Sequence, residues 1–303
     1  MNEAELLFTQ ILNCNLQDLY LDREKPLDKQ NSEFISTVLR RRVAGEPIQY
    51  ILGKTEFMGL EFKVIPGVFI PRPETEILVE TAIKIIKSQS SAKIWRIPPN
   101  FGETSPAKLA VRHNSARPRQ QGWRGHQVSK LKILDIGTGS GCIAVSLAKL
   151  LPNAEVTATD VSSLALEVAK ENAKLNNVDV NFIESSLFEV PDSGAVAYDL
   201  IVSNPPYIST SEIQLLQREV RYEPRVALDG GRNGLNFYRR IIKNAPENLV
   251  ENGYLILEMG FTQRQCIEKI VHTSKGLSVV EIARDYNNIE RVVVLKKNGS
   301  QHG

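Results

Sequence analysis

The spacing of apolar residues over the first 50 positions is that of helices. Residues 4–12 and 34–39 each carry apolar side chains at intervals of three and four, which is typical of amphipathic helices. The second stripe leads into Arg40-Arg41-Arg42 and then Gly45-Glu46-Pro47, a sequence that ends helices. We therefore predict a small helical domain over residues 1–48.

Between residues 50 and 70 the pattern changes to that of short strands. Aromatic and aliphatic residues flank Gly59 and Gly67, so residues 49–72 are predicted to form a hairpin that links two domains. Pro71-Arg72-Pro73-Glu74-Thr75-Glu76 then places proline and acidic residues where helices begin. A second domain is predicted over residues 73–298.

The second domain alternates between strand patterns and helix patterns. Seven strands are expected, at residues 131–136, 155–159, 180–183, 198–203, 254–258, 279–283 and 291–295. The last two are close enough in sequence to pair as a hairpin. The alternation predicts an α/β fold, in which a mostly parallel sheet has helices on both faces and is closed by an antiparallel pair.

Residues 88–130 differ from the rest of this domain. They are rich in Ser, Pro, Gln and Arg and show no sustained period, which predicts a disordered insertion. Residues 91–130 carry a net charge of +7, so the remainder carries −5 within the chain's total of +2. A mildly acidic body is untypical of proteins that bind duplex nucleic acid. We favour an inert insertion over an RNA contact, because no interleaved aromatic residues support base stacking.

Composition also bears on location and metal binding. No apolar run approaches the ~18 residues that a bilayer requires, and the first five residues lack the basic region of a signal peptide, so a cytoplasmic protein is expected. Three cysteines and four histidines lie too far apart for a disulfide framework or a zinc site. We therefore predict no metal.

A glycine-rich loop follows the first strand of the predicted sheet. Gly137-Thr138-Gly139-Ser140-Gly141 joins that strand to a helix, and such glycines let a ligand approach backbone N–H groups. The spacing departs from the dinucleotide fingerprint G-x-G-x-x-G, which weakens the case for a nicotinamide cofactor. Asp160 ends the second strand, 19 residues after Gly141. An acid at this place commonly accepts hydrogen bonds from ribose hydroxyls.

The tetrapeptide Asn204-Pro205-Pro206-Tyr207 follows the fourth strand. Ligands of open α/β sheets bind at the carboxyl ends of the strands. The two prolines stiffen this rim, Asn204 offers both an acceptor and a donor, and Tyr207 offers a flat aromatic face. An Asn-Pro turn that merely ends the strand is the alternative. The glycine loop and Asp160 favour a binding site.

Several motifs together resemble those of one enzyme family. Residues 133–141, followed by Asn-Pro-Pro-Tyr at 204–207, resemble S-adenosylmethionine-dependent methyltransferases that act on a planar nitrogen. More narrowly, five further motifs resemble the peptide chain release factor glutamine methyltransferases, the HemK family. They are Gly45-Glu46-Pro47-Ile48-Gln49-Tyr50, Pro71-Arg72-Pro73-Glu74-Thr75-Glu76, Arg221-Tyr222-Glu223-Pro224, Arg284-Asp285-Tyr286 and Glu290-Arg291. The resemblance runs from about residue 4 to residue 296, omitting the insertion.

This resemblance implies both a fold and an activity. The fold would be a seven-stranded Rossmann-like class I methyltransferase domain, preceded by a small helical substrate-recognition domain. The activity would be methyl transfer from S-adenosylmethionine, with S-adenosylhomocysteine as product, to the glutamine side-chain amide nitrogen in the Gly-Gly-Gln motif of class I peptide chain release factors. This modification supports translation termination. The release factors would be the partners of a monomer that has no membrane or specific nucleic-acid partner.

The resemblance also assigns residues to the cofactor and the substrate. The methionine part would lie on Gly137, Thr138, Gly139, Ser140 and Gly141, the ribose on Asp160, and the adenine on Leu187, with Asn204 also bordering the cofactor. Ser186 stands where many members have an acid. The substrate amide would lie on Asn204, Pro205, Pro206 and Tyr207. The Asn204 side-chain oxygen and the Pro205 carbonyl would be the catalytic acceptors of the two amide protons. Glu258 and Arg72 would frame the cleft and are assigned no chemistry.

Two other functions fit part of this pattern. An adenine-N6 methyltransferase acting on nucleic acid faces the same chemical problem at an exocyclic amine, but the acidic body and the lack of a separate basic domain count against it. An adaptor could dock Pro205-Pro206-Tyr207 in an aromatic groove. That sequence lacks the spacer of a P-P-x-Y ligand, and it adjoins a buried strand.

Overall fold

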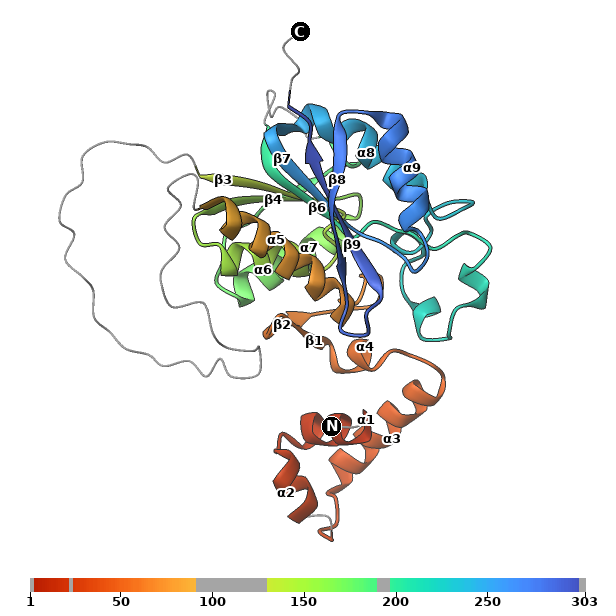
Figure 1. Ribbon diagram of the computed structural model, residues 1–303. Coiled ribbons are helices and arrows are strands. Elements are labelled where there is room, and N and C mark those ends of the chain that lie inside the picture. Colours follow the sequence, from red (N-terminus) through yellow and green to blue (C-terminus); the bar gives the residue numbers. More distant parts are fainter. Residues whose placement is uncertain (1–2, 22–23, 91–129, 190–196, 300–303) are drawn as a thin grey trace, which may run out of the picture.

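Helices and strands alternate along most of the computed structural model, which describes residues 3–21, 24–90, 130–189 and 197–299 (Figure 1). The helices are α1 Glu3–Leu12, α2 Leu16–Leu21, α3 Lys29–Val43, α4 Ile48–Leu52, α5 Glu76–Ser90, α6 Cys142–Leu150, α7 Ser163–Leu175, α8 Asn236–Asn248 and α9 Arg264–Ser274. The strands are β1 Lys54–Phe57, β2 Leu60–Lys63, β3 Leu131–Ile136, β4 Ala154–Asp160, β5 Asn181–Glu184, β6 Tyr198–Ser203, β7 Leu249–Glu258, β8 Leu277–Arg284 and β9 Glu290–Lys297. No helix within these ranges has both the length and the apolar character needed to cross a membrane.

Seven of these strands form one sheet, in the order β5-β4-β3-β6-β7-β9-β8. The first five strands in this order are parallel, and β9 runs antiparallel to both β7 and β8. The predicted α/β fold with a closing antiparallel pair is confirmed. Strand β7 is longer than the sequence pattern indicated, because residues 249–253 extend it at its amino end.

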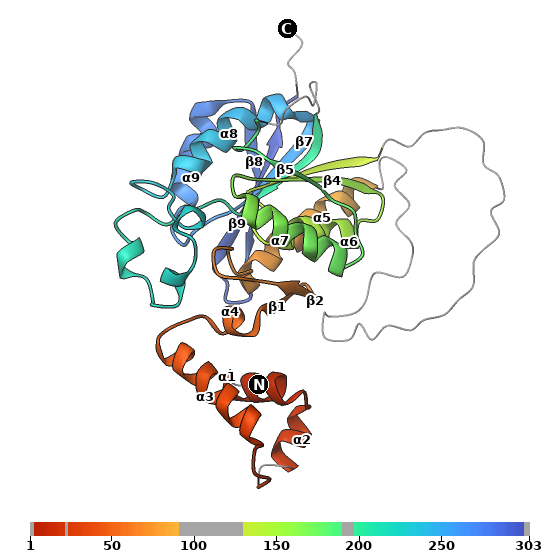
Figure 2. The same ribbon diagram turned by 180° about the vertical axis from the view of Figure 1, so that it is seen from behind.

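Apolar residues at alternate positions of the central strands pack on opposite faces of the sheet. Ile133 and Leu200 belong to a core formed with α5, α6 and α7, whereas Leu134 and Ile201 belong to a core formed with α8 and α9. Successive side chains of a strand point to opposite faces, so one strand contributes to both cores. Figure 2 shows the two helical layers from behind. The sheet is thereby covered on both faces, as its near-continuous apolar strands require.

Strands β3 and β6 are neighbours in the sheet although they are distant in sequence. The chain leaves β3 toward β4 on one side and returns to β6 on the other, so the strand order reverses between β3 and β6. Ile136 pairs with Ser203 and also with Thr159 of β4, so these three strands end level with one another. Such a switch point is where open α/β sheets bind ligands.

Helices α1 to α3 lie away from the sheet, and α4 with the β1/β2 hairpin lies between them and the rest (Figure 1). The sequence patterns predicted α1 and α3 but did not indicate α2 or α4. Residues 48–52 are helical up to Gly53, so the hairpin begins at Lys54 and not at the predicted residue 49. The helical region also touches the distant segment before α8, since Arg42 pairs with Glu219 at 2.6 Å.

Helix α5 begins where its proline and acidic residues predicted, and it continues further than expected. One face of it is buried through Leu78, Thr81, Ala82 and Ile85, which are spaced three or four residues apart or adjacent. The helix runs to Ser90, so residues 88–90, which were assigned to the insertion, belong to it. Residues 91–129 of the predicted insertion lie outside the described residues.

Candidate active site

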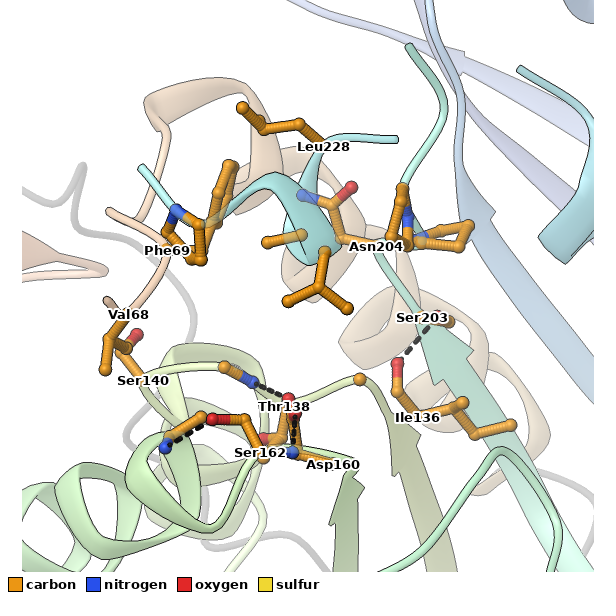
Figure 3. Close-up of a pocket in the computed structure, with 18 of the residues that line it drawn as sticks. Val68, Phe69, Ile136, Thr138, Ser140, Asp160, Ser162, Ser203, Asn204 and Leu228 are labelled. Carbon is orange, nitrogen blue, oxygen red and sulfur yellow. Dashed lines mark hydrogen bonds between the residues drawn. The ribbon is translucent and has the colours of Figure 1, made fainter. Parts of the chain in front are cut away.

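A cavity of about 310 Å³ opens at the carboxyl ends of β3, β4 and β6. In Figure 3, Thr138 and Asp160 lie on one side of it, and Phe69, Asn204 and Leu228 lie on the opposite side. The sequence-predicted residues that line the cavity are Gly137, Thr138, Gly139, Ser140, Asp160, Leu187, Asn204, Pro205, Pro206 and Tyr207. Gly141 does not line it. The glycine loop and the Asn-Pro-Pro-Tyr rim therefore face a common space.

The glycine loop is attached to the neighbouring strand by its backbone. The N–H groups of Gly137 and Thr138 both donate to the carbonyl oxygen of Thr159, at 2.8 and 2.9 Å. The Thr138 hydroxyl donates to Oδ2 of the buried Asp135 at 2.6 Å. Burial raises the pKa of Asp135 to about 7. These bonds fix the loop at the level where β3 and β4 end.

Asp160 holds the middle of the same loop. Its Oδ2 accepts from the Gly139 N–H at 2.8 Å, and its Oδ1 accepts from the Ser162 N–H at 2.9 Å. Ser162 in turn caps α7, because its hydroxyl accepts from the Ala165 N–H at 3.2 Å. Burial raises the pKa of Asp160 above its usual value. A carboxylate oxygen has more than one lone pair, so Asp160 can accept from ligand hydroxyls as well.

The space above the loop fits a nucleoside-type cofactor. A methyl group added at Gly137 would meet no atom within 4 Å, and one added at Gly139 would approach only the Phe69 side chain, at 3.9 Å. The cavity therefore reaches the loop backbone at both positions. Apolar side chains form much of the remaining wall, while Asp160 offers acceptors at its edge. Open backbone, an apolar wall and one acidic acceptor suit the methionine, adenine and ribose parts of S-adenosylmethionine.

Leu187 and Ser186 follow β5 at the far end of the cavity. Leu187 lines the cavity and has the positive backbone angle φ of 58°, which is uncommon for a branched residue. Ser186 accepts a hydrogen bond from the Arg240 guanidinium at 3.2 Å. The serine at this position therefore contacts an arginine. The predicted adenine contact of Leu187 stays a prediction.

Asn204 stands at the end of β6, between two other strand ends. The Ser203 hydroxyl donates to the Ile136 carbonyl at 2.7 Å, which ties β6 to β3 directly below the rim. On the other side Ser203 pairs with Leu257, so Glu258 is level with Asn204. The Asn204 Nδ2 donates to the Thr75 hydroxyl oxygen at 3.1 Å. The Asn204 side chain is thus engaged by groups on the β7 side of the sheet.

Glu258 is a charged group in a site almost closed to solvent. Its side chain is 2% exposed, the Thr75 and Asn204 side chains lie beside the carboxylate, and its Oε2 has no hydrogen-bond partner within the described residues. Burial raises the pKa of Glu258 to about 7, although Thr75, Arg291 and Asn204 oppose the shift. The sequence pattern named Glu258 without a role. Its position next to Asn204 follows from the strand register, which the sequence did not give.

Tyr207 is held by its backbone and is half-buried at the cavity wall. The Gln263 side-chain amide donates to the Tyr207 carbonyl oxygen at 3.0 Å. Burial raises the pKa of the Tyr207 phenol above its usual value. The phenol therefore stays neutral at physiological pH and offers the cavity an aromatic surface without charge.

The wall opposite the glycine loop includes residues that the sequence pattern did not assign. The Arg72 guanidinium lies 5.1 Å from the centre of the Phe69 ring and pairs with the buried carboxylate of Glu223. Glu223 also accepts from the Ile70 N–H at 3.1 Å. This carboxylate therefore joins the segment before α5 to the segment before α8. The motifs that contain Arg72 and Glu223 were visible in the sequence, but their pairing was not.

Comparisons with known proteins place both parts of the chain in the same family. Residues 1–53 match the family model of the PrmC N-terminal domain, and residues 126–232 match that of the methyltransferase small domain. The release factor glutamine methyltransferase of Geobacter sulfurreducens is 40% identical over 292 residues, which cover 96% of this chain and 87% of the relative. That of Thermodesulfovibrio yellowstonii is 35% identical, with coverage of 99% and 94%.

A solved structure shows the same fold at lower identity. A methyltransferase from Pyrococcus furiosus matches 87% of this chain and 99% of its own, with a TM-score of 0.50 and 18% identity. At that identity the likeness concerns the fold alone. The sequence relatives share far more residues and match nearly the whole length of both chains. The chain therefore belongs to the family of the release factor glutamine methyltransferases.

Proposed function

We propose that this protein transfers a methyl group from S-adenosylmethionine to the glutamine side-chain amide nitrogen in the Gly-Gly-Gln motif of class I peptide chain release factors. The observation that carries the proposal is the near-complete match to relatives named for this activity. The cavity supports it, because the glycine loop and the Asn-Pro-Pro-Tyr rim face one another across a space with an acidic acceptor at its edge. The product would be S-adenosylhomocysteine.

The chemical difficulty lies in the amide nitrogen, whose lone pair is delocalised into its carbonyl. When bound, S-adenosylmethionine supplies an electrophilic methyl group on a positively charged sulfur. In the proposal, the Asn204 Oδ1 and the Pro205 carbonyl accept the two amide protons and direct the nitrogen lone pair at that methyl group. Pro206 and Tyr207 flank the flat amide. The nitrogen would gain a bond to the methyl carbon while the carbon–sulfur bond breaks and leaves its electron pair on sulfur, and one amide proton would pass to solvent. The residues of the rim therefore act by positioning and by dipoles.

The direct test is labelled methyl transfer to purified release factor. We expect incorporation into the wild-type factor and none into a factor whose Gly-Gly-Gln glutamine is replaced by alanine. Oligonucleotides that contain adenine serve as a parallel substrate and should stay unlabelled. Activity that persists on the alanine variant would reject the glutamine target, and label in the oligonucleotide alone would favour an adenine-N6 methyltransferase.

An Asn204→Ala variant tests the role of the rim. We expect it to bind S-adenosylhomocysteine nearly as the parent does, because the glycine loop and Asp160 are retained, and to lose methyl transfer. Calorimetry measures the first property and the labelled assay the second. Near-normal turnover would contradict the assignment of Asn204.

The proposal extends to the partners and the organisation of the chain. Residues 1–48 would select the release factor, and residues 73–298 would carry out the transfer. The enzyme would act as a monomer in the cytoplasm, where release factors work. It would need no metal, because the proposed chemistry calls on carbonyl acceptors alone. Light scattering, and activity that survives a chelator, test these two points.

A further inference from the structure

The proposed role of Asn204 requires its oxygen to face the substrate. An amide side chain has an oxygen that only accepts and a nitrogen that only donates, on two arms of similar shape. If the side chain turned by half a rotation, Nδ2 would meet the protons of the substrate amide and two donors would oppose one another. The orientation of this side chain is therefore as important as its presence, and the rim by itself does not fix it.

Two buried groups behind the rim engage the nitrogen arm. The Asn204 Nδ2 donates to the Thr75 hydroxyl oxygen at 3.1 Å, and the Glu258 carboxylate, whose buried Oε2 has no hydrogen-bond partner within the described residues, lies beside both side chains. No hydrogen bond engages the Asn204 Oδ1 within the described residues. Thr75 is 1% exposed and Glu258 2% exposed, so few other groups can replace these partners. The donor arm thus points into the protein, and Oδ1 is left for a ligand.

The carboxylate sets the direction of the hydrogen bonds. Above its raised pKa of about 7 Glu258 is ionised and has no proton to give, so a Thr75 hydroxyl that bonds to it must donate its proton to the carboxylate. The Thr75 oxygen can then only accept from its next neighbour. Asn204 therefore has to present Nδ2 and not Oδ1 to Thr75. A glutamine in place of Glu258 would carry both donors and acceptors and would lose this direction.

We infer that Thr75 and Glu258 are positioning residues that hold Asn204 with its Oδ1 toward the substrate amide. The inference rests on the proposed function, because it concerns the glutamine amide as methyl acceptor. Thr75 comes from the turn Pro73–Thr75 that begins α5, and Glu258 ends β7. Thr75 precedes Asn204 in the sequence and Glu258 follows it, and the two elements meet behind the rim. Neither side chain would itself touch the reacting atoms.

Steady-state kinetics on four single variants test this inference. Thr75→Val keeps the shape of the side chain and removes its hydroxyl, and we expect a roughly 100-fold lower kcat because a misplaced acceptor costs about this much. Glu258→Gln should lower kcat roughly tenfold or more, as expected for one lost bond to a charged group. Thr75→Ser restores the hydroxyl and should recover most of the kcat. Thr81→Val removes another buried hydroxyl of α5 and should leave kcat unchanged.

The substrate KM and cofactor-site binding separate positioning from general damage. For Thr75→Val we expect little change in the KM for release factor and in the affinity for S-adenosylhomocysteine measured by calorimetry. A Thr75→Val enzyme with wild-type kcat would overturn the inference. So would a Thr75→Ser enzyme no better than Thr75→Val. A wild-type enzyme that methylates no release factor would refute the proposed function. The orientation of the Asn204 side chain would still be tested by the amide proton exchange described next.

A spectroscopic measurement on the wild-type protein does not depend on how the variants fold. In protein labelled with ¹⁵N-asparagine, the Asn204 side-chain signals can be assigned by their loss in Asn204→Ala. We expect its two amide protons to exchange with water much more slowly than those of the exposed Asn233. Exchange as fast as that of Asn233 would show that Nδ2 faces solvent, and would overturn the inference.

Discussion

Replacing Gly141 by alanine tests how the glycine loop is built. Gly141 precedes α6 with a φ of 82°, a conformation that residues with side chains rarely adopt. An added methyl group would lie 2.9 Å from the Cβ and 3.2 Å from the Cα of Ala169 in α7. Gly137 offers a matched control in the same loop. Its φ is 72°, and a methyl group there would meet no atom within 4 Å.

The two substitutions share one cost and differ in another. Alanine at a positive φ costs roughly 1–2 kcal/mol, and this applies at both positions. Overpacking adds about 1–3 kcal/mol where neighbouring atoms cannot move, which applies only at Gly141 because the Ala169 backbone is part of the contact. For a chain of this size each kcal/mol lowers the Tm by roughly 2 °C. The Gly141→Ala Tm should therefore lie roughly 2–6 °C below that of Gly137→Ala.

Thermal and urea unfolding measure this difference. A double variant, Gly141→Ala with Ala169→Gly, removes the nearer atom of the clash. It should be more stable than the sum of the two single effects by about 1 kcal/mol or more, because residues in contact do not act additively. Equal Tm losses at Gly137 and Gly141, or strict additivity in the double variant, would refute the packing explanation of Gly141.

Three further predictions concern charged groups near the cavity. Asp160→Asn removes the charge and replaces with a donor one of the two oxygens that accept from backbone N–H groups, so the proposed ribose site also loses an acceptor. Its affinity for S-adenosylhomocysteine in calorimetry should fall roughly 10- to 100-fold, whereas Asp199→Asn, at the start of β6, should bind normally. Arg72→Met leaves the buried Glu223 without its cation and should destabilise the protein by roughly 3 kcal/mol in urea unfolding. This value is near the low end for a broken buried ion pair, because Arg72 is 30% exposed. An unchanged unfolding midpoint would contradict the prediction. The pKa of Glu258 is about 7 in the folded protein, against an ordinary glutamate value of 4.5. Between these two pH values the folded protein retains a proton that the unfolded chain has released. The stability of the protein should therefore fall as the pH rises from 4.5 to about 7. Glu258→Gln stays neutral and should gain stability relative to the parent between about pH 5 and about pH 8, and a constant difference across that range would contradict the shifted pKa.

The sequence predicted those parts of the fold whose local signals are strong. Strands β3 and β6 were placed at their observed bounds, because each is a mainly apolar run that ends at clear turn residues. The glycine loop before α6 was also found from residue type alone. Helices α2 and α4 are only 6 and 5 residues long, too short to show a period. Among the helices, length decided which ones the pattern revealed.

The candidate site also contains residues that local sequence motifs predicted and contacts that they did not. Its glycine loop, Asp160 and the Asn-Pro-Pro-Tyr rim are contiguous motifs next to strand ends, so sequence reasoning could place them at one edge. The pairs behind the rim join positions far apart in the chain. Thr75 meets Asn204 from 129 positions away, and Ile70 meets Glu223 from 153 positions away. A single sequence contains no signal for such contacts, because they depend on tertiary packing.

The level ends of β3, β6 and β7 give Asn204 two neighbours with different tasks. On the β3 side lies the glycine loop, whose open backbone suits a cofactor, and on the β7 side lies Glu258, which engages the nitrogen of the Asn204 side chain. A shift of one residue in either pairing would move a neighbour by about 3.3 Å and turn its side chain to the other face of the sheet. Both tasks therefore depend on the register of the same central strand. The buried hydrogen bond from the Ser203 hydroxyl to the Ile136 carbonyl joins β6 to β3 one residue before Asn204. This bond between the two strands therefore lies directly beside the residue whose position depends on their register.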